Sequence, residues 1–287
     1  MIYAWIAIVA LIVDNLVSDF VLHNSSLNVV MFVLFWFLSG TIMGLVLCQA
    51  KQTSYKQNFK ALQPYWGKLS LYLAASVIAP FLWMQAVLVV GIGDSVLLAQ
   101  AATLIPIVFG ALYFKEKFSA KDIFFLSLVA LGVVTFLYKG SQALGLGALL
   151  VLVASSLYAV QGIFKKIFAG NVDYVFVITL RAFCTTLAAL IVALATGLFV
   201  LPTEWWVYAL CFFGGTVGSF ANKYYWFKSM ESVDLSRFAI ISEVKTVLVY
   251  LLAVAFLNET ITEQKIIGGS LILAGAIFFS TRKKEIK

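Results

Sequence analysis

Charged and amide side chains lie inside long apolar stretches of this sequence, and their types suit the binding of a polar solute. Residues 2–22 carry Asp14, Asn15, Ser18 and Asp19, which fall on an arc of about 140° at about 100° per residue and so form one polar stripe of a helix. The other such residues are Gln85, Gln100, Gln161, Arg181, Asn222, Lys223, Glu243 and Lys245. Because a charge near the centre of a membrane helix costs about 2.5–3.5 kcal/mol to insert, residues of this kind mark a functional site by default.

The mixture of charges indicates the chemistry of the substrate. Three carboxylates (Asp14, Asp19 and Glu243) balanced by Arg181 and Lys223 would suit a zwitterion or another polar metabolite that carries charge. Aromatic rings at the same level would stack on a flat or cationic group: Trp83, Tyr158, Tyr225 and Trp226. The predicted substrate-binding set is Asp14, Asp19, Gln100, Tyr158, Gln161, Arg181, Asn222, Lys223, Trp226 and Glu243. We expect no catalytic residue, no bound metal and no cofactor.

Structural roles compete with a substrate site at three of these positions. Lys223 lies within two turns of the predicted inner surface and could extend its ammonium to water there. Arg181 and Glu243 could form a purely structural ion pair. Lys245 lies about 200° around the helix from Glu243, so we expect Lys245 to contact a neighbouring helix. His23, at the outer edge of the first helix, is expected to be a solvated loop residue.

The elements that position these residues are membrane-spanning helices. The chain of 287 residues is 63% apolar and 11% charged, with a mean hydropathy of +1.02, whereas soluble domains are about one quarter charged. Ten apolar runs are long enough to cross a hydrocarbon layer of about 30 Å: 2–22, 27–49, 68–90, 94–113, 121–139, 144–168, 172–198, 204–227, 235–257 and 262–280. The first run is expected to span the membrane rather than to act as a signal peptide. Three cysteines within the runs, without CxxC spacing, are expected to be packing residues: Cys48, Cys184 and Cys211.

The basic residues predict the orientation. With the N-terminus inside, the inner loops and tail hold fourteen Lys and Arg residues, and the outer loops hold two, Lys139 and Lys265. This positive-inside bias predicts cytoplasmic termini in the plasma (inner) membrane. The net charge of +7 therefore needs no nucleic-acid partner.

The two halves of the chain repeat each other. Residues 83–136 align without a gap to 226–279, and in this repeat alignment the matched pairs include Trp83 with Trp226, Thr103 with Thr246, Glu116 with Glu259 and Gly132 with Gly275. Each half holds five runs, an odd number, so the second half enters from the opposite side. The sequence thus predicts two inverted five-helix repeats, 1–140 and 141–287, around a central cavity that opens to either face.

Gln100 and Glu243 are equivalent in the repeat alignment and should both face the cavity. A carboxylate in a low-dielectric cavity takes up a proton more readily than in water unless a cation offsets the desolvation. Glu243, Asp14 and Asp19 are therefore candidate proton carriers.

The pattern resembles the drug/metabolite transporter superfamily, in its EamA-type branch. The residues that carry the resemblance are 111–119 (ALYFKEKFS) with Gly132, and 254–262 (VAFLNETIT) with Gly275. Pro106 matches the proline usual in the fourth helix, and its counterpart Val249 departs from the pattern. The resemblance extends over nearly the whole chain and implies a ten-helix transporter of small organic metabolites, often an exporter.

Other classes fit less well. Residues 91–94 (GIGD) match a short pattern of intramembrane aspartyl proteases, but Arg237 stands at the repeat position of Asp94 where a second carboxylate would be needed. The ordinary interpretation of Asp94 is a helix start. A channel would show rings of like charge. A lipid-linked substrate flippase of the same superfamily is a closer alternative, and it would need a lateral opening and a basic headgroup pocket, for which Arg181 and Lys223 could serve.

The sequence thus predicts an all-α polytopic membrane protein that is not an enzyme. We expect a secondary active transporter of an amino acid or a related nitrogenous solute, coupled to protons or working by exchange. Its expected partners are the solute and membrane lipids, and its expected state is a monomer or a homodimer.

Overall fold

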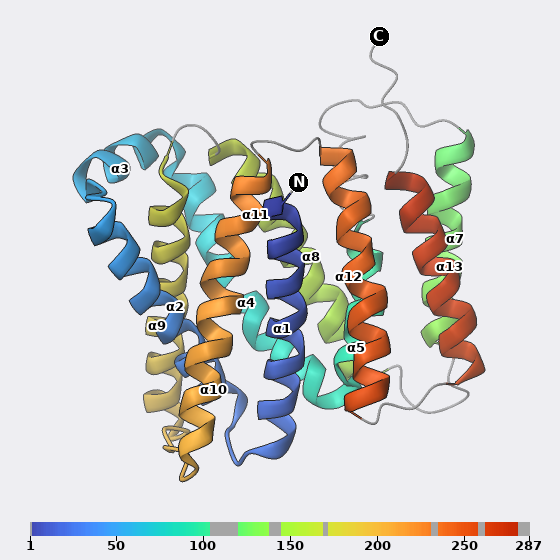
Figure 1. Ribbon diagram of the computed structural model, residues 1–287, viewed down its shortest axis with the longest axis horizontal. Helices are drawn as coiled ribbons and strands as arrows, with labels where there is room; N and C mark the ends of the chain where they lie inside the picture. The colour runs from blue at the N-terminus through green and yellow to red at the C-terminus, as the bar shows by residue number, and fades with distance from the viewer. Residues whose placement is uncertain are drawn as a thin grey trace.

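The computed structural model describes residues 2–103, 120–137, 145–168, 172–230, 235–257 and 262–280. Within these residues all regular secondary structure is helical, and the long helices run side by side across one bundle (Figure 1). The prediction of an all-α polytopic membrane protein is confirmed.

Within the described residues, each predicted apolar run corresponds to a helix or a chain of helices. The first half contains α1 (Ile2–Asn24), α2 (Val29–Ala50), α3 (Tyr55–Leu62), η1 (Gln63–Tyr65), α4 (Trp66–Val90), α5 (Ile92–Leu98), η2 (Ala99–Thr103) and α7 (Ala120–Leu137). The second half contains α8 (Leu146–Phe168), α9 (Tyr174–Thr196), α10 (Trp205–Gly215), η3 (Thr216–Ala221), α11 (Asn222–Met230), α12 (Leu235–Phe256) and α13 (Glu263–Ser280). Four stretches are long and apolar enough to span a membrane by length and composition: Trp5–Asn24, Val29–Ala50, Tyr55–Val90 and Tyr174–Thr196.

Two predicted runs are divided in the structure. The run 94–113 begins as α5 and tightens into the 3₁₀-helix η2, and its remainder, with Pro106 and Glu116, lies outside the described residues. The run 204–227 contains the π-helix η3 between α10 and α11. Because π-helical turns are rare and frequently lie at functional sites, η3 is a marker for the site described below.

Local chemistry sets the ends of several helices. Gly91, at a φ of 84° that favours glycine, separates α4 from α5. The side chains of Asn28 and Asp173 accept hydrogen bonds of 2.9 Å from the backbone N–H groups of Met31 and Val175, which caps α2 and α9. Asp94 lies in the first turn of α5, at the predicted helix start, but the N-cap residue is Gly91 and not Asp94.

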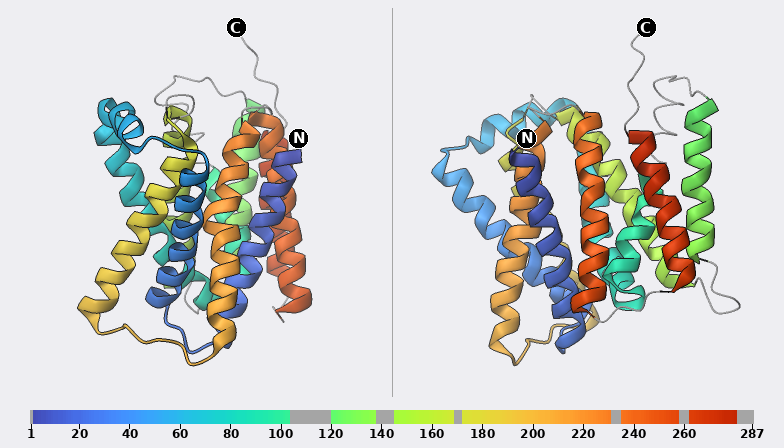
Figure 2. Two further views of the ribbon diagram at one scale, coloured as in Figure 1. Left: turned by 60° about the vertical axis from the view of Figure 1, so that its left-hand side comes forward. Right: turned by 45° about the vertical axis from the view of Figure 1, so that its right-hand side comes forward.

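Helix pairing follows a regular exchange pattern. α7 packs on α13, α4 on α8, and α2 on α9, while α1 packs against α10, η3 and α11, and α5 packs on α12 (Figures 1 and 2). If each helix is replaced by its counterpart in the repeat alignment, the same pairs result. For example, the pair of α4 with α8 becomes the pair of α10 and α11 with α1. The start of α1 and the end of α13 lie at the same end of the bundle, together with α3 (Figure 1).

The α7–α13 crossing shows this exchange at the level of single atoms. A Cβ on Gly132 would lie 2.7 Å from the Gly268 carbonyl oxygen, and a Cβ on Gly275 would lie 2.8 Å from the Phe125 carbonyl oxygen. Gly132 is the repeat counterpart of Gly275, and Phe125 is the repeat counterpart of Gly268. Small residues of this kind let two membrane helices approach closely enough for backbone packing to hold them together.

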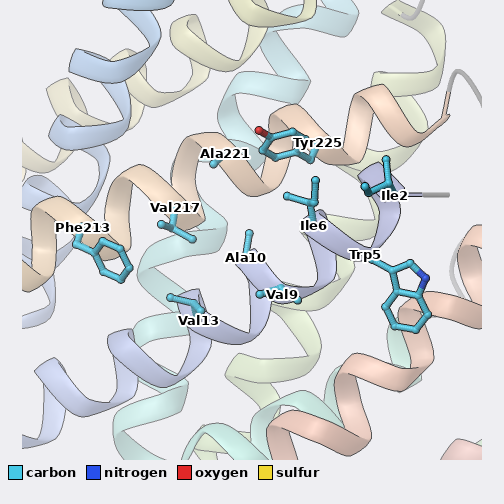
Figure 3. A pocket seen from close by; sticks show the side chains of 10 residues that line it. All are labelled: Ile2, Trp5, Ile6, Val9, Ala10, Val13, Phe213, Val217, Ala221 and Tyr225. Atoms are coloured by element: carbon cyan, nitrogen blue, oxygen red, sulfur yellow. The ribbon is translucent and has the colours of Figure 1, made fainter.

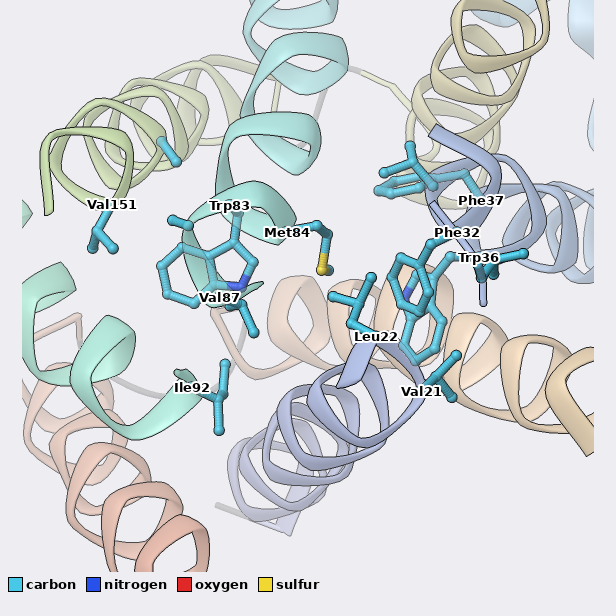
Figure 4. Packing of buried hydrophobic residues seen from close by; sticks show 14 of the residues in the cluster. Val21, Leu22, Phe32, Trp36, Phe37, Trp83, Met84, Val87, Ile92 and Val151 are labelled. Atoms are coloured by element: carbon cyan, nitrogen blue, oxygen red, sulfur yellow. The ribbon is translucent and has the colours of Figure 1, made fainter. Parts of the chain in front are cut away.

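An apolar core fills the space between α1, α2, α4, α5 and α8 (Figure 4). Phe32 and Trp36 stack within it, with ring centroids 4.7 Å apart, and both are almost fully buried. The core thereby fixes the indole of Trp36 next to the polar cluster of the site.

Candidate functional site

Three charged side chains from three helices interact in the interior of the bundle. Asp14 of α1 interacts electrostatically with Lys223 of α11 and Arg181 of α9. Trp36 of α2 donates its indole N–H to Asp14 Oδ1 over 3.2 Å. The structure thus brings together three of the predicted site residues, one from the first half of the chain and two from the second.

A glycine-rich segment makes room for Asp14. A Cβ on Gly218, in the π-helix η3, would collide with the Asp14 carboxylate. Cβ atoms on Gly214 and Gly215 would collide with Trp36, the residue that donates to Asp14. The glycines of the sequence GGTVG are therefore required for packing at this site, because only residues without a side chain allow this segment to lie against Asp14 and Trp36.

Arg181 is buried with unused hydrogen-bonding capacity. Its side chain is 2% exposed, and its guanidinium carbon lies 5.3 Å from the centre of the Phe37 ring. Within the part of the chain that the structure describes, Nε and Nη1 have no hydrogen-bond acceptor. A buried guanidinium normally uses all its donors, since an unmade bond to a charged group costs about 1–3 kcal/mol or more. Two N–H donors therefore remain for an acceptor outside the described residues, either a side chain such as Glu243 or a bound solute.

Other buried polar atoms beside Arg181 are also unsatisfied. Tyr72 of α4 interacts electrostatically with Arg181. One turn further along α4, the carbonyls of Ala75 and Ser76 accept from Gln161 of α8 (3.2 Å) and Thr185 of α9 (3.3 Å). Gln161 Oε1 has no partner among the described residues, and the hydroxyls of Tyr72 and Ser76, one turn apart on α4, have at most each other. These groups place hydroxyls and an amide oxygen on two helices that pack around one guanidinium.

Lys223 points into the bundle rather than toward its inner surface. Its Nζ lies 5.9 Å from the centre of the Tyr158 ring, and Tyr158 meets Trp83 edge-on at 6.2 Å between centroids. Its charged neighbours are Arg181, Asp14 and Lys245. The snorkelling alternative for Lys223 does not describe this structure.

Lys245 and Trp226 form a contact between two helices. The Lys245 Nζ lies 5.8 Å from the centre of the Trp226 ring, which joins α12 to α11. This geometry agrees with the expected contact of Lys245 with a neighbouring helix. It also places Trp226, one of the predicted site residues, beside a lysine.

Asn222 and Gln100 fasten helices to each other. Asn222 is fully buried, and its Nδ2 donates to the Ala7 carbonyl of α1 over 2.8 Å, while its Oδ1 has no partner among the described residues. Gln100 of η2 donates from Nε2 to Thr246 Oγ1 of α12. Thr246 is the repeat counterpart of Thr103, so Gln100 bonds across the two repeats.

Asp19 lies away from the central cluster. Its carboxylate is 3.3 Å from His23 Nδ1, and it accepts a hydrogen bond from the backbone N–H of Ile92 at the start of α5. His23 is exposed to solvent, as predicted, but it lies in the last turn of α1 rather than in a loop, beside the Asp19 carboxylate.

The side chain of Glu243 lies outside the described residues, although its backbone belongs to α12. Its predicted role at the site stays a prediction. The same holds for its proposed pairing with Arg181.

Sequence reasoning did not single out Trp36, Phe37 or Tyr72. Each is an aromatic residue in an apolar run, and nothing in its type or spacing separates it from the packing aromatics around it. The one feature of the sequence that could have indicated this part of the site was the group of glycines in residues 214–218 (GGTVG). Among the described residues no group of three His, Cys, Asp or Glu side chains could hold a metal ion.

The fold and the buried charges describe an integral membrane protein whose interior, not its surface, holds a polar cluster. The second half of the chain, residues 145–281, matches the model of the EamA-like transporter family. The predicted resemblance to this family is confirmed over this half of the chain, and the match supports a membrane transporter of the drug/metabolite transporter type.

A solved structure shows that the fold extends over both halves. One solved crystal structure aligns with 96% of this chain and with 95% of its own chain, at a TM-score of 0.67 and 16% sequence identity. A comparison with curated proteins gives no match.

Proposed function

We propose that this protein is a secondary active transporter of a small polar organic metabolite, an amino acid or a related zwitterionic nitrogenous solute. The observation that carries the proposal is the buried guanidinium of Arg181, whose Nε and Nη1 have no acceptor among the described residues. A planar guanidinium matches a carboxylate with two parallel hydrogen bonds, and these are stronger in a dry site than in water.

The charge balance around Arg181 supports a zwitterion. Among the described residues, the cations Arg181, Lys223 and, beside Lys223, Lys245 outnumber the one anion, Asp14. A substrate carboxylate on Arg181 would neutralise part of the excess positive charge. A substrate ammonium would find the Asp14 carboxylate and the face of Tyr158 as partners. The hydroxyl of Tyr72 and the oxygen of Gln161 would complete the hydrogen bonds of the solute.

Alternating access fits the position of the site between the two proposed repeats, 1–140 and 141–287. Asp14 belongs to the first repeat, whereas Arg181 and Lys223 belong to the second. Rocking of one repeat against the other would open the cluster first to one side and then to the other. Asp14 and Glu243 are the proposed proton carriers, and substrate exchange is the alternative form of coupling. The proposed location is the plasma (inner) membrane with cytoplasmic termini.

A thermal-shift screen of metabolites on the purified protein tests the proposal. A ligand that binds the folded state raises its stability by RT ln(1 + [L]/Kd), so a true substrate at about 100 times its Kd should stabilise by about 2.7 kcal/mol. We expect zwitterionic amino acids to shift the melting temperature and to support counterflow in proteoliposomes. A protein stabilised by inorganic ions alone, or by lipid-linked solutes alone, would contradict the proposal.

A further inference from the structure

We infer that the outer surface of the bundle carries a binding site for one anionic phospholipid, formed by a groove along α1 and a pair of lysines at its end. The groove lies between α1 and the α10–η3–α11 segment (Figure 3). It is separate from the transport site proposed above and does not depend on that function.

The shape and chemistry of the groove fit an acyl chain. Small side chains, Ala10 and Ala221, form part of its lining between the larger Trp5 and Phe213 (Figure 3). Exposed residues of this lining, such as Val9, are apolar and face the lipid. The lining therefore offers van der Waals contact along one chain, which is what packs apolar groups together inside a bilayer.

The length of the groove matches one leaflet. Its lining on α1 extends from Ile2 to Val13, which is about 16 Å at about 1.5 Å per residue. Half of a hydrocarbon layer of about 30 Å is about 15 Å. The groove starts at the end of the bundle where the N-terminus lies (Figure 1), so its occupant is a lipid of the leaflet on that side.

Lysines and tyrosines continue from that end of the groove. Tyr225, which lines the groove, stacks on Tyr3 with ring centroids 6.2 Å apart. The Lys228 Nζ lies 4.4 Å from the Tyr3 ring centre and 5.8 Å from that of Tyr224. Lys51 approaches the same Tyr224 ring at 5.2 Å. Two ammonium groups thus converge on one tyrosine at the membrane interface.

This arrangement matches the two parts of an anionic phospholipid. Lysines at a membrane surface attract anionic headgroups, and tyrosines are typical of the headgroup level. The phosphate would lie at Lys228 and Lys51, and one chain would follow the groove toward Val13 and Phe213. The positive charge of the two lysines favours an anionic lipid, and the groove has room for one lipid molecule.

Native mass spectrometry of the purified full chain, titrated with phosphatidylglycerol or phosphatidylcholine, tests the inference. We expect one tightly bound phosphatidylglycerol, held at least about tenfold more strongly than phosphatidylcholine. The double variant Lys51→Gln/Lys228→Gln should weaken phosphatidylglycerol binding about tenfold. The matched control Lys56→Gln/Lys60→Gln removes two exposed charges from α3 and should leave binding unchanged.

A second pair of variants tests the groove. Ala221→Phe should fill the groove and lower the affinity for both lipids, whereas Leu194→Phe, on the exposed face of α9, should not. An unshifted melting temperature in lipid-free detergent shows that each variant is folded; if Ala221→Phe fails this check, Val217→Phe replaces it. Equal binding of the two lipids, or equal losses in the lysine variant and its control, would overturn the inference.

Discussion

Two contacts in this molecule, the α7–α13 crossing and the Asp14–Arg181–Lys223 cluster, differ in how they treat the repeat. At the crossing the contacts are reciprocal: Gly132 meets Gly268, and Gly275 meets Phe125, so each contact is the repeat counterpart of the other. In the cluster Asp14 has no acidic counterpart, because position 157 is Leu. The comparison indicates that the repeat symmetry persists where helices only pack and is lost at the charged cluster, where we propose that an asymmetric solute binds.

The π-helix makes the same point. η3 interrupts the segment that contacts Asp14 through Gly218, whereas its counterpart region in α4 is a continuous helix through Pro80. The extra residue of a π-turn shifts the register of the helix. The local departure from the repeat therefore coincides with the charged cluster.

The largest effect is expected at Arg181. Replacing Arg181 by Gln removes the charge and the two-pronged donor, so we expect transport to fall by about 100-fold or more, because charge-assisted hydrogen bonds contribute about 1.5–3 kcal/mol each. Arg181→Lys keeps the charge without the planar fork and should recover only a part. Uptake in proteoliposomes measures the change, and equal activity of wild type and both variants would remove Arg181 from the site.

The next effect concerns Glu243, the proposed proton carrier that stands where the first repeat has an amide. Glu243→Gln keeps the shape of the side chain, so we expect it to abolish uptake driven by a pH gradient while exchange at equal pH continues. If Glu243 instead only pairs with Arg181, the variant should misfold or give a low yield, because a buried cation is left unpaired. Unchanged pH-driven uptake in a folded variant would move the proposal to Asp14.

Gly218→Ala should disturb the cluster without removing a charge. The added methyl group must displace the Asp14 carboxylate or the η3 backbone, and overpacking of this kind costs about 1–3 kcal/mol. We expect substrate affinity to fall about tenfold. Gly162→Ala is the matched control, since a Cβ there has no neighbour within 4 Å. Ligand-dependent thermal shifts compare the two, and equal affinities would separate η3 from binding.

The α7–α13 crossing should respond in the opposite way. Gly132→Ala and Gly275→Ala each place a Cβ against backbone atoms, so both should lower stability by a similar amount, about 1–3 kcal/mol, and leave substrate affinity unchanged. Gly269→Ala, where the nearest atom would lie 3.4 Å away, is the control. Unequal losses at Gly132 and Gly275 in thermal unfolding would break the symmetry on which the comparison depends.

The smallest effect is expected at Tyr158. Tyr158→Phe keeps the ring that faces Lys223 and should change affinity less than about threefold. Tyr158→Leu loses the cation–π contact, which is typically about 0.5–2 kcal/mol, and should weaken binding by several-fold. A larger loss in Phe than in Leu would show that the hydroxyl, not the ring, contacts the solute.

The fold was largely predictable from the sequence because hydropathy alone places helices in a bilayer. The predicted runs coincide with α1, α2, α4 and α7 to α13. Two runs contain an irregular turn, the 3₁₀-helix η2 in one and the π-helix η3 in the other. The π-helix and the amphipathic helix α3 were not predictable in this way, because a register shift of one residue leaves the hydropathy profile unchanged and α3 lies outside the apolar runs.

The site was predictable only for residues that are costly to bury. Asp14, Arg181 and Lys223 stand out by charge, and the structure brings them together. Trp36 and Tyr72 could not be found, because an aromatic residue in an apolar run has the same appearance whether it packs or binds. Asp19 lies on the same face of α1 as Asp14. Because it is five residues further along the helix, about 7.5 Å, it lies next to α5 instead of the central cluster.

The most direct test of the account is the binding of matched solutes to the wild-type protein and to Arg181→Lys. The solutes are an amino acid identified by the thermal-shift screen, the amine that lacks its carboxylate, and the acid that lacks its ammonium. We predict that the amino acid binds the wild-type protein at least about tenfold more tightly than the amine, and that Arg181→Lys removes most of this difference. Equal affinity for the amino acid and the amine, unchanged by the substitution, would contradict the assignment of Arg181 as the residue that binds the carboxylate.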